Sequence, residues 1–385
     1  MKIGVIGSGA MGTGIAQVAA QAGHEVYIYD TRDAALEQSR HKLESTFAKL
    51  VEKQKFTKAY ADEVLHRIVF EDNLRDFEHC GLVIEAIVEK LDAKRSVFNT
   101  LEEIVKEDCI LATNTSSLSI ASISSGMKRP GRLIGIHFFN PAPLMPLVEI
   151  IPGLQTDDEI TQQATALIKD WKKVTVLAKD TPGFIVNRVA RPFYSEAIKL
   201  YEEGFADIPT IDWAMREIGG FKMGPFELMD LIGHDVNYVV TETVWTQFYF
   251  DPRFRPSITQ KRLLEAGLLG RKSGKGFYDY SKTAPLLQPN RDNQLGQQIV
   301  DRILALLINE AADAVFMQIG TAADVDLAMT KGVNYPKGLL QWAEEIGLEV
   351  ILKRLEELHE FYGDDRYRPC PLVRKLVSEG KGFQL

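Results

Sequence analysis

The sequence predicts an α/β domain at the N-terminus, followed by two tandem all-α domains. Up to Thr181, short apolar runs alternate with helical patterns, as they do in βαβ units. From Pro182 onward, β-branched runs become rare and one helical pattern follows another. The helical part also repeats itself, and 385 residues are too many for one ordinary core. We therefore expect domains at residues 1–181, 182–281 and 297–385.

The expected strands of the first domain are short apolar runs alternating with helical patterns. They cover residues 3–6, 26–29, 68–70, 82–86, 110–112, 133–136, 147–151 and 174–177. The longest helical stretches between them cover residues 34–52 and 91–105. The turn-forming group at 180–183 ends this alternation, and the apolar start of a helix follows it.

The internal repeat of the helical part has a constant offset of 114 residues. The matching segments are Ser195-Glu196-Ala197 with Asn309-Glu310-Ala311, residues 211–215 with 325–329, and Gly233 with Gly347. Chance rarely keeps one register over such a distance. We therefore expect a duplicated helical domain, with a first copy at 182–281 and a second copy at 297–385. The segment 281–296 between them is rich in Pro, Asn, Gln and Ser, as linkers are.

Composition and charge exclude some classes of function. The chain is 45% hydrophobic and 25% charged, and its net charge of −8 argues against nucleic-acid binding as the main task. No apolar run approaches the length needed to span a bilayer, and we expect no signal peptide. Cys80, Cys109 and Cys370 have no metal or redox spacing, so we expect no metal site and a reducing, cytoplasmic location.

A glycine-rich motif, Gly7-Ser8-Gly9-Ala10-Met11-Gly12, directly follows the first expected strand and opens a helical pattern. The first glycine allows a tight turn, the second lets the backbone approach a pyrophosphate, and the third lets helix and strand pack closely. The helix N-terminus adds N–H donors for phosphates. The motif predicts a Rossmann-type, dinucleotide-binding domain. The expected cofactor contacts are Gly7, Gly9, Met11 and Gly12.

Asp30 ends the second expected strand, 18 residues beyond Gly12, where a carboxylate can bind the ribose hydroxyls of an adenosine. Its charge would repel a 2′-phosphate, which favours NAD over NADP as the cofactor. Arg32 lies close by and weakens this inference. FAD is bound by the same fingerprint, so the glycines alone do not choose the cofactor.

His137 follows the expected strand 133–136, and the end of a strand in an open α/β sheet is where ligands bind. A neutral imidazole has the right pKa to take the hydroxyl proton when an alcohol loses hydride. The alternative is a core histidine whose polar atoms are satisfied. Glu149 stands inside the apolar run 147–151, so it needs a partner if buried. Pairing with His137 would fix the tautomer of the ring.

A hydroxyl-rich segment, Asn114-Thr115-Ser116-Ser117, follows the expected strand 110–112. Its hydroxyls could bind a substrate oxygen at the same edge of the sheet. For Ser117 a second interpretation is open, because a serine shortly before Ile120 also fits the N-cap of a helix.

These segments resemble L-3-hydroxyacyl-CoA dehydrogenases, with the 3-hydroxybutyryl-CoA dehydrogenases looking closest. The resemblance covers roughly residues 1–280, and its most specific parts are those around His137 and Asn187. The motifs in the family's order are Gly7–Gly12 and residues 83–89, 114–118, 137–141, 180–188, 223–228 and 274–278. The resemblance implies reversible, NAD-dependent oxidation of an (S)-3-hydroxyacyl-CoA, such as 3-hydroxybutyryl-CoA, to the 3-oxoacyl-CoA. The setting would be fatty-acid metabolism, in β-oxidation or a butyrate-type route.

The resemblance also implies roles for single residues. His137 would be the base and Glu149 its orienting partner, while Ser116 and Asn187 would hydrogen-bond the region of the reacting oxygen. The further NAD contacts would be Glu89, Lys94, Ser116, Asn140 and Lys272.

Positive charge for the phosphates of CoA stands at the end of the expected helix 34–52, in Lys49, Lys53 and Lys55. Basic residues also suit the C-terminus of a helix electrostatically, which is the alternative interpretation. The resemblance gives Lys49 and Lys53 a second role as CoA contacts.

Two other functions remain open. One is a related β-hydroxyacid dehydrogenase of the gulonate type, which shares more of the histidine motif than other such families do. Families that use a catalytic lysine would carry it near the start of the helical domain, where this chain has Asn187-Arg188. The other is a non-catalytic NAD-binding protein, which would not need the set His137, Glu149, Ser116 and Asn187.

The second copy is expected to be catalytically silent, because Asp301 stands where the first copy has Asn187. In single-copy relatives, the resemblance implies, the helical domain is the surface through which two subunits associate. A second copy in the same chain can occupy that surface, since linkage gives it a high effective concentration. We therefore expect a pseudo-dimer that is a monomer in solution, or a homodimer through another surface.

Overall fold

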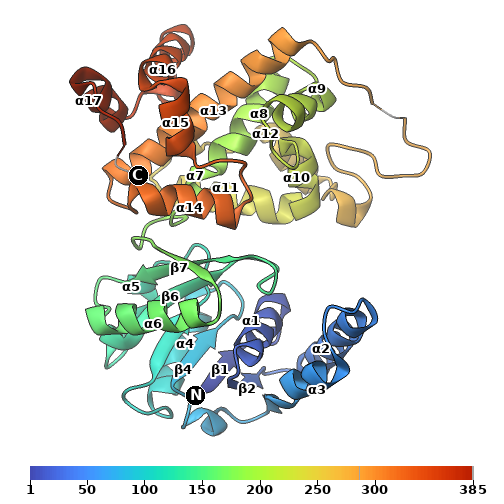
Figure 1. The fold of residues 1–385 in the computed structure, drawn as a ribbon, viewed down its shortest axis with the longest axis vertical. Helices are drawn as coiled ribbons and strands as arrows, with labels where there is room; N and C mark the ends of the chain where they lie inside the picture. The colour runs from blue at the N-terminus through green and yellow to red at the C-terminus, as the bar shows by residue number, and fades with distance from the viewer. Residues whose placement is uncertain (286, 384–385) are drawn as a thin grey trace. The chain divides into compact units, whose positions relative to one another are not determined.

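The computed structural model describes residues 1–285 and 287–383, in two compact units, Met1–Thr181 and Pro182–Leu385 (Figure 1). Residue 286 of the expected linker and residues 384–385 of the expected third domain lie outside the described residues. Over the described part of the chain, no helix combines the length and apolar character needed to cross a membrane.

The first unit is built on one sheet, whose strand order over the described residues is β3-β2-β1-β4-β5-β6-β7-β8. Strands β1 to β6 run parallel, β7 is antiparallel to β6, and β8 is parallel to β7. Each lies where a strand is expected from the sequence. Their bounds are β1 Lys2–Ile6, β2 Glu25–Tyr29, β3 Ile68–Glu71, β4 Leu82–Glu85, β5 Ile110–Thr113, β6 Leu133–Phe138, β7 Leu147–Pro152 and β8 Val174–Leu177.

Helices connect these strands and cover the sheet, which explains why central strands such as β4 and β5 are buried along their whole length. The helices are α1 Ala10–Gln21, α2 Asp33–Glu52, α3 Lys58–His66, α4 Leu91–Glu102, α5 Ile120–Ser124 and α6 Asp158–Asp170, with 3₁₀ turns η1 Leu74–Phe77 and η2 Pro130–Arg132. Helix α5 begins at the N-cap Ser119, whose side chain accepts from the N–H of Ser122. The N-cap interpretation of Ser117 is therefore wrong, because the helix starts two residues later.

The described residues of the second unit form helices joined by loops, together with two isolated β-bridges around Lys275. Its first part holds α7 Val186–Val189, α8 Arg191–Glu202, α9 Ile208–Trp213, the π-helical segment η3 Ala214–Ile218, α10 Pro225–Ile232, α11 His234–Gln247, η4 Pro252–Phe254, α12 Ile258–Glu265 and η5 Arg271–Ser273. Its second part holds α13 Asn293–Phe316, α14 Ala322–Gly332, α15 Leu339–Ile346, α16 Leu348–Tyr362, η6 Asp365–Tyr367 and α17 Pro371–Glu379. Helix α13 thus begins inside the expected linker.

The repeat is visible helix by helix. Helices α10 and α15 begin and end at the same offset of 114 residues. Asp212 accepts two backbone N–H groups at the start of α10, at 2.9 and 3.0 Å, and Asp326 does the same for α15, at 2.8 and 2.9 Å. Gly233 and Gly347, the expected pair, adopt φ of 95° and 96° between consecutive helices. The predicted fold class, an α/β domain followed by two tandem helical domains, is confirmed.

One difference between the copies lies at the start of each. The first copy has two helices, α7 and α8, where the second has the single helix α13. Pro192 explains the break, because proline lacks the N–H that would bond the carbonyl of Arg188 and its ring clashes with that carbonyl. Leu306 stands at the equivalent position of the second copy, so α13 continues.

Two ion pairs join the copies in a symmetric way. Nε of Arg188 lies 2.6 Å from Oε1 of Glu310, and Nε of Arg302 lies 2.5 Å from Oε1 of Glu196. The two arginines are equivalent in the repeat, and so are the two glutamates. Reciprocal contacts of this kind define a two-fold, isologous interface. The helical unit therefore has the contact pattern of a symmetric dimer formed within one chain.

Candidate active site

Residues proposed for the site follow five neighbouring strands at the points where the strands end. Gly7 follows β1, Asp30 follows β2, Glu89 and Ser116 come after β4 and β5, and His137 is near the end of β6. Because these strands are parallel, their carboxyl ends meet at one edge of the sheet. That edge, close to where the strand order reverses between β1 and β4, is the ligand-binding position of open α/β sheets.

The glycine loop has the shape needed for a pyrophosphate. Gly7 has a φ of 99°, and a Cβ on Gly12 would lie 1.8 Å from the carbonyl oxygen of Gly7, so no side chain fits there. A Cβ on Gly9 would meet nothing within 4 Å, which leaves the backbone open to a ligand. Gly9 is also the N-cap of α1 and makes no side-chain cap, so the first N–H groups of α1, from Ala10 and Met11 onward, suit a phosphate. The loop fits the pyrophosphate of NAD.

Asp30 is held in place by that same loop. Its Oδ2 accepts from the backbone N–H of Ser8 at 2.9 Å and from the Ser8 hydroxyl at 3.0 Å, while Nε of Arg32 lies 3.5 Å from Oδ1. Burial alone would raise the pKa of Asp30, but the hydrogen bonds from Ser8 and the charge of Arg32 lower it. A negative charge therefore stands at the end of β2 near neutral pH.

Asp30 should make the enzyme prefer NADH strongly over NADPH. Repulsion between two charges near a protein surface is worth about 1–4 kcal/mol, and 1.4 kcal/mol is tenfold in affinity. Asp30→Ala should narrow the ratio of kcat/KM between the two cofactors by roughly tenfold or more. Steady-state kinetics with both cofactors measure this ratio. Equal kcat/KM in the unmodified protein would mean that Arg32 overrides the carboxylate.

His137 and Glu149 form the closest pair of titratable groups among the proposed site residues of the first unit. They face each other in the antiparallel register of β6 and β7, and Nδ1 of His137 lies 2.7 Å from Oε2 of Glu149. His137 is 6% exposed and Glu149 is completely buried. A carboxylate only accepts hydrogen bonds, so this contact places the ring proton on Nδ1 and the lone pair on Nε2. Nε2 is then the atom that can take a proton from a substrate.

Glu149→Gln should lower kcat on the order of 10²-fold or more, as loss of an orienting carboxylate does when it selects the wrong tautomer. The amide of glutamine can donate to Nδ1, which favours the tautomer whose proton sits on Nε2. The affinity for NADH should not change, because the glycine loop is untouched. A variant with unaltered kcat and an unaltered melting temperature would exclude this role of Glu149.

Glu89 organises the segment that contains Ser116. It accepts from the backbone N–H groups of Ser116 at 3.0 Å and Ser117 at 3.2 Å, and from the hydroxyl of Thr115. Nζ of Lys94 lies 3.1 Å from the second carboxylate oxygen of Glu89. Burial would raise the pKa of Glu89, but Lys94 and the hydrogen bond from Thr115 lower it. Ser116 is therefore held by an ionised carboxylate.

Lys94 itself is 1% exposed, and its ammonium also donates to Glu85 at 2.7 and 2.9 Å. A side chain buried this deeply can influence a cofactor through Glu89. The sequence interpretation gave Glu85 no role, although it is a carboxylate at the end of the apolar strand β4. A buried carboxylate needs a partner, so the argument used for Glu149 would also have predicted an ion pair for Glu85. Asn114, also without a predicted role, accepts from the N–H of Phe138 at 2.8 Å and so fixes the residue next to His137.

The remaining proposed site residues are Asn140, Lys49, Lys53, Asn187 and Lys272. Asn140 is exposed just after β6, and Lys49 and Lys53 are exposed at the end of α2. Asn187 lies on α7 and Lys272 in η5, both in the helical unit. Lys272 forms an ion pair with Asp235 there, at 2.5 Å.

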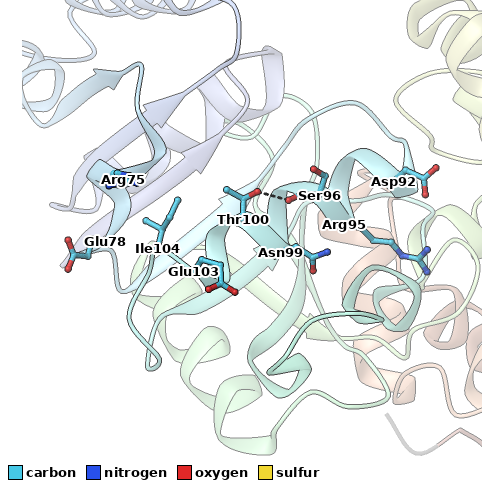
Figure 2. Close-up of a pocket in the computed structure, with 9 residues that line it drawn as sticks. All are labelled: Arg75, Glu78, Asp92, Arg95, Ser96, Asn99, Thr100, Glu103 and Ile104. Carbon is cyan, nitrogen blue, oxygen red and sulfur yellow. Dashed lines mark hydrogen bonds between the residues drawn. The ribbon is translucent and has the colours of Figure 1, made fainter.

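A hollow of about 1040 Å³ runs along α4, and Figure 2 shows the side chains that line it. It is lined by Arg75, Glu78, Asp92, Arg95, Ser96, Asn99, Thr100, Glu103 and Ile104. None of these is a proposed site residue. The described residues also contain no group of three or more His, Cys, Asp or Glu arranged to hold a metal ion.

The strand order, the glycine loop with Asp30, and the buried histidine–glutamate pair at the same edge define an NAD-dependent dehydrogenase. Family models give the narrower assignment. The NAD-binding domain of 3-hydroxyacyl-CoA dehydrogenases matches residues 2–181, and the C-terminal domain of these enzymes matches twice, at residues 183–280 and 299–383. The chain belongs to the 3-hydroxyacyl-CoA dehydrogenase family.

Some similar proteins span the whole chain, and others span about three quarters of it. A 3-hydroxyadipyl-CoA dehydrogenase of Escherichia coli is 37% identical over 99% of this chain and 98% of its own length. The crystal structure of a 3-hydroxybutyryl-CoA dehydrogenase from Escherichia coli K12 superposes with a TM-score of 0.94 at 36% identity and covers 99% of both chains. A probable 3-hydroxybutyryl-CoA dehydrogenase of Deinococcus radiodurans is 45% identical over 73% of this chain and its own entire length.

Proposed function

We propose that this protein oxidises the 3-hydroxyl of a short (S)-3-hydroxyacyl-CoA to the 3-oxoacyl-CoA, reversibly and with NAD. The observation that carries the proposal is the buried pair of His137 and Glu149, 2.7 Å apart, at the edge of the sheet that holds the glycine loop. Family membership supports the CoA thioester as the class of substrate. Fatty-acid metabolism, through β-oxidation or a butyrate-type route, is the setting that this chemistry fits.

The protein's residues have distinct tasks in this reaction. His137 takes the hydroxyl proton on Nε2, and Glu149 holds the ring in the tautomer that allows it. Ser116 and Asn187 hydrogen-bond the reacting oxygen and so orient the C3 hydroxyl. The glycine loop and Asp30 would hold NAD, which would supply the acceptor for the hydride of C3. In the reverse direction the protonated His137 donates to the ketone.

Anionic groups of the substrate also need a place to bind. Lys49 and Lys53 are exposed at the C-terminal end of α2, and we assign them to the phosphates of CoA. Their charges also stabilise the helix terminus, so both roles can coexist.

An assay of NADH absorbance with acetoacetyl-CoA tests the function. We expect NADH to be consumed, and a chain with no turnover would overturn the proposal in favour of a non-catalytic NAD-binding protein. A comparison of kcat/KM for 3-hydroxybutyryl-CoA and 3-hydroxyadipyl-CoA then selects the acyl group, since similar proteins are named for each. Turnover of free gulonate-type hydroxyacids, without CoA, would favour the related dehydrogenases instead.

We further propose that the helical unit is a pseudo-dimer of copies at 182–281 and 297–385, the second catalytically silent. The two reciprocal ion pairs support this, because each partner comes from a different copy. Asp301, which replaces Asn187 in the second copy, forms an ion pair with Arg354 at 2.7 Å. With this arrangement we propose a monomer in solution, or a homodimer through another surface. The three cysteines are all buried free thiols, which suits the cytoplasmic location that we propose.

A further inference from the structure

Arg188 connects the proposed substrate-binding helix to the silent second copy. It directly follows Asn187 on α7, and its side chain is 2% exposed. Its Nε lies 2.6 Å from Oε1 of Glu310, and its Nη2 lies 2.6 Å from Oδ2 of Asp313. Both acids are on α13. The guanidinium therefore bonds two carboxylates of the second copy in a fixed geometry.

The helix that carries Asn187 is very short. Helix α7 has four residues, which is far too short to be stable without packing. It follows Gly183 and Phe184, whose φ angles are 74° and 47°, and it ends at the break caused by Pro192. Within the helical unit, α7 packs against α13 and α14 of the second copy. It also packs against α8 of its own copy, so the orientation of Asn187 depends on contacts from both copies.

Arg191 holds the same helix from the other end. Its Nε donates to the carbonyl oxygen of Asn187 at 2.8 Å, and its Nη1 donates to the hydroxyl of Thr241 at 3.0 Å. This contact lies within the first copy. The Arg191 contact fixes the carbonyl group of Asn187. The Arg188 contacts then restrict rotation of the helix about that group.

The reciprocal ion pair supplies an internal comparison. Arg302 and Glu196 are joined as Arg188 and Glu310 are, across the same two-fold interface. Each arginine has a second acid, Glu203 at 3.0 Å for Arg302 and Asp313 for Arg188. Yet Arg302 stands on the continuous helix α13, next to Asp301. The two pairs are equivalent in the repeat, and each glutamate also faces a second arginine, Arg253 at 3.3 Å for Glu310 and Arg366 at 3.6 Å for Glu196. Only the Arg188 pair adjoins a proposed substrate contact.

We propose that Glu310 and Asp313 of the second copy are positioning residues, which set the orientation of Asn187 through Arg188. The inference rests on the proposed dehydrogenase function. The second copy then contributes to turnover without touching the substrate. Displacement of an orienting group by 1 Å can cost on the order of 10²-fold in rate, so a partial loss of this contact should be measurable.

The test compares two isosteric substitutions in the full-length protein, Glu310→Gln and Glu196→Gln. Each removes one carboxylate charge that faces two arginines, and each leaves the second acid of Arg188 or Arg302 in place. We expect both to lower the melting temperature by similar amounts. Glu310→Gln should lower kcat with acetoacetyl-CoA on the order of tenfold, while Glu196→Gln stays within about twofold. The dissociation constant of NADH should be unchanged in both, because the glycine loop is in the other unit.

A double-mutant cycle identifies the route of the effect. If Glu310 acts through Asn187, then Glu310→Gln should lower kcat much less in an Asn187→Ala background than in the unmodified chain. Equal kcat losses in the two glutamine variants would overturn the proposal, as would a Glu310→Gln protein that loses stability and keeps its kcat. If the Glu310→Gln protein is too unstable to measure, Asp313→Asn replaces it in the comparison, because it leaves Glu310 in place. An unmodified chain without turnover is a different result, because it removes the proposed function itself.

Discussion

Replacing His137 with alanine is expected to lower kcat by roughly 10²–10⁴-fold, the usual contribution of a general base. The imidazole is buried and lies 2.7 Å from Glu149, and alanine has no atom that could accept the hydroxyl proton in its place. The measurement is single-turnover oxidation of 3-hydroxybutyryl-CoA, which separates the chemical step from product release. Binding of NADH should persist, because the residues around the pyrophosphate are unchanged.

A matched control is His66→Ala, which removes an exposed histidine at the end of α3. It should leave both kcat and the melting temperature as they are. If His137→Ala turned over at a near-normal rate while remaining folded, another group would have to be the base, and the proposed mechanism would be wrong.

Truncation after Tyr280 is expected to have the second large effect, a change of association state. It removes the helices that cover α7, α8 and η3. Phe221, whose ring lies 5.0 Å from that of Tyr335 and 6.0 Å from that of Trp342, would lose both partners. Full burial of such a side chain is worth about 1.5–3 kcal/mol, and a large uncovered apolar face promotes association. We expect a dimer or an aggregate in size-exclusion chromatography with light scattering.

The ion pairs show why a dimer is the more specific outcome. The truncated chain keeps Arg188 and Glu196, which are equivalent to Arg302 and Glu310, so two truncated chains can form both pairs with each other. The Deinococcus relative aligns over its entire length with 280 residues of this chain. Adding Glu196→Gln to the truncated chain should then weaken its dimer. A truncated protein that stays monomeric, with the same melting temperature and activity, would contradict the pseudo-dimer.

The strands were predictable because their signal is local. Runs such as Leu82–Glu85 are buried along their whole length, and apolar residues bounded by turns report this directly. The pairing of His137 with Glu149 could also be expected, because a carboxylate in a buried strand needs a partner and the neighbouring candidate was close in sequence. Their facing positions in β6 and β7 follow from the antiparallel register.

What the sequence did not show were contacts between residues far apart in the chain. Arg188 was visible as part of a motif, but the acids that hold it are 122 and 125 residues away. The repeat contained the necessary information, since Glu310 was already matched with Glu196. Only a structure reveals that the copies face each other through those residues.

The reciprocal ion pairs have a consequence for how this interface can change. In an assembly of identical subunits, every substitution at a two-fold contact is made twice, and both halves must tolerate it. Here each half is encoded separately, so a residue can be altered on one side alone. Asp313, which bonds Arg188, stands where the first copy has Lys199, and Met317 stands where it has Glu203. The two halves of the interface can therefore differ in sequence and still face each other permanently.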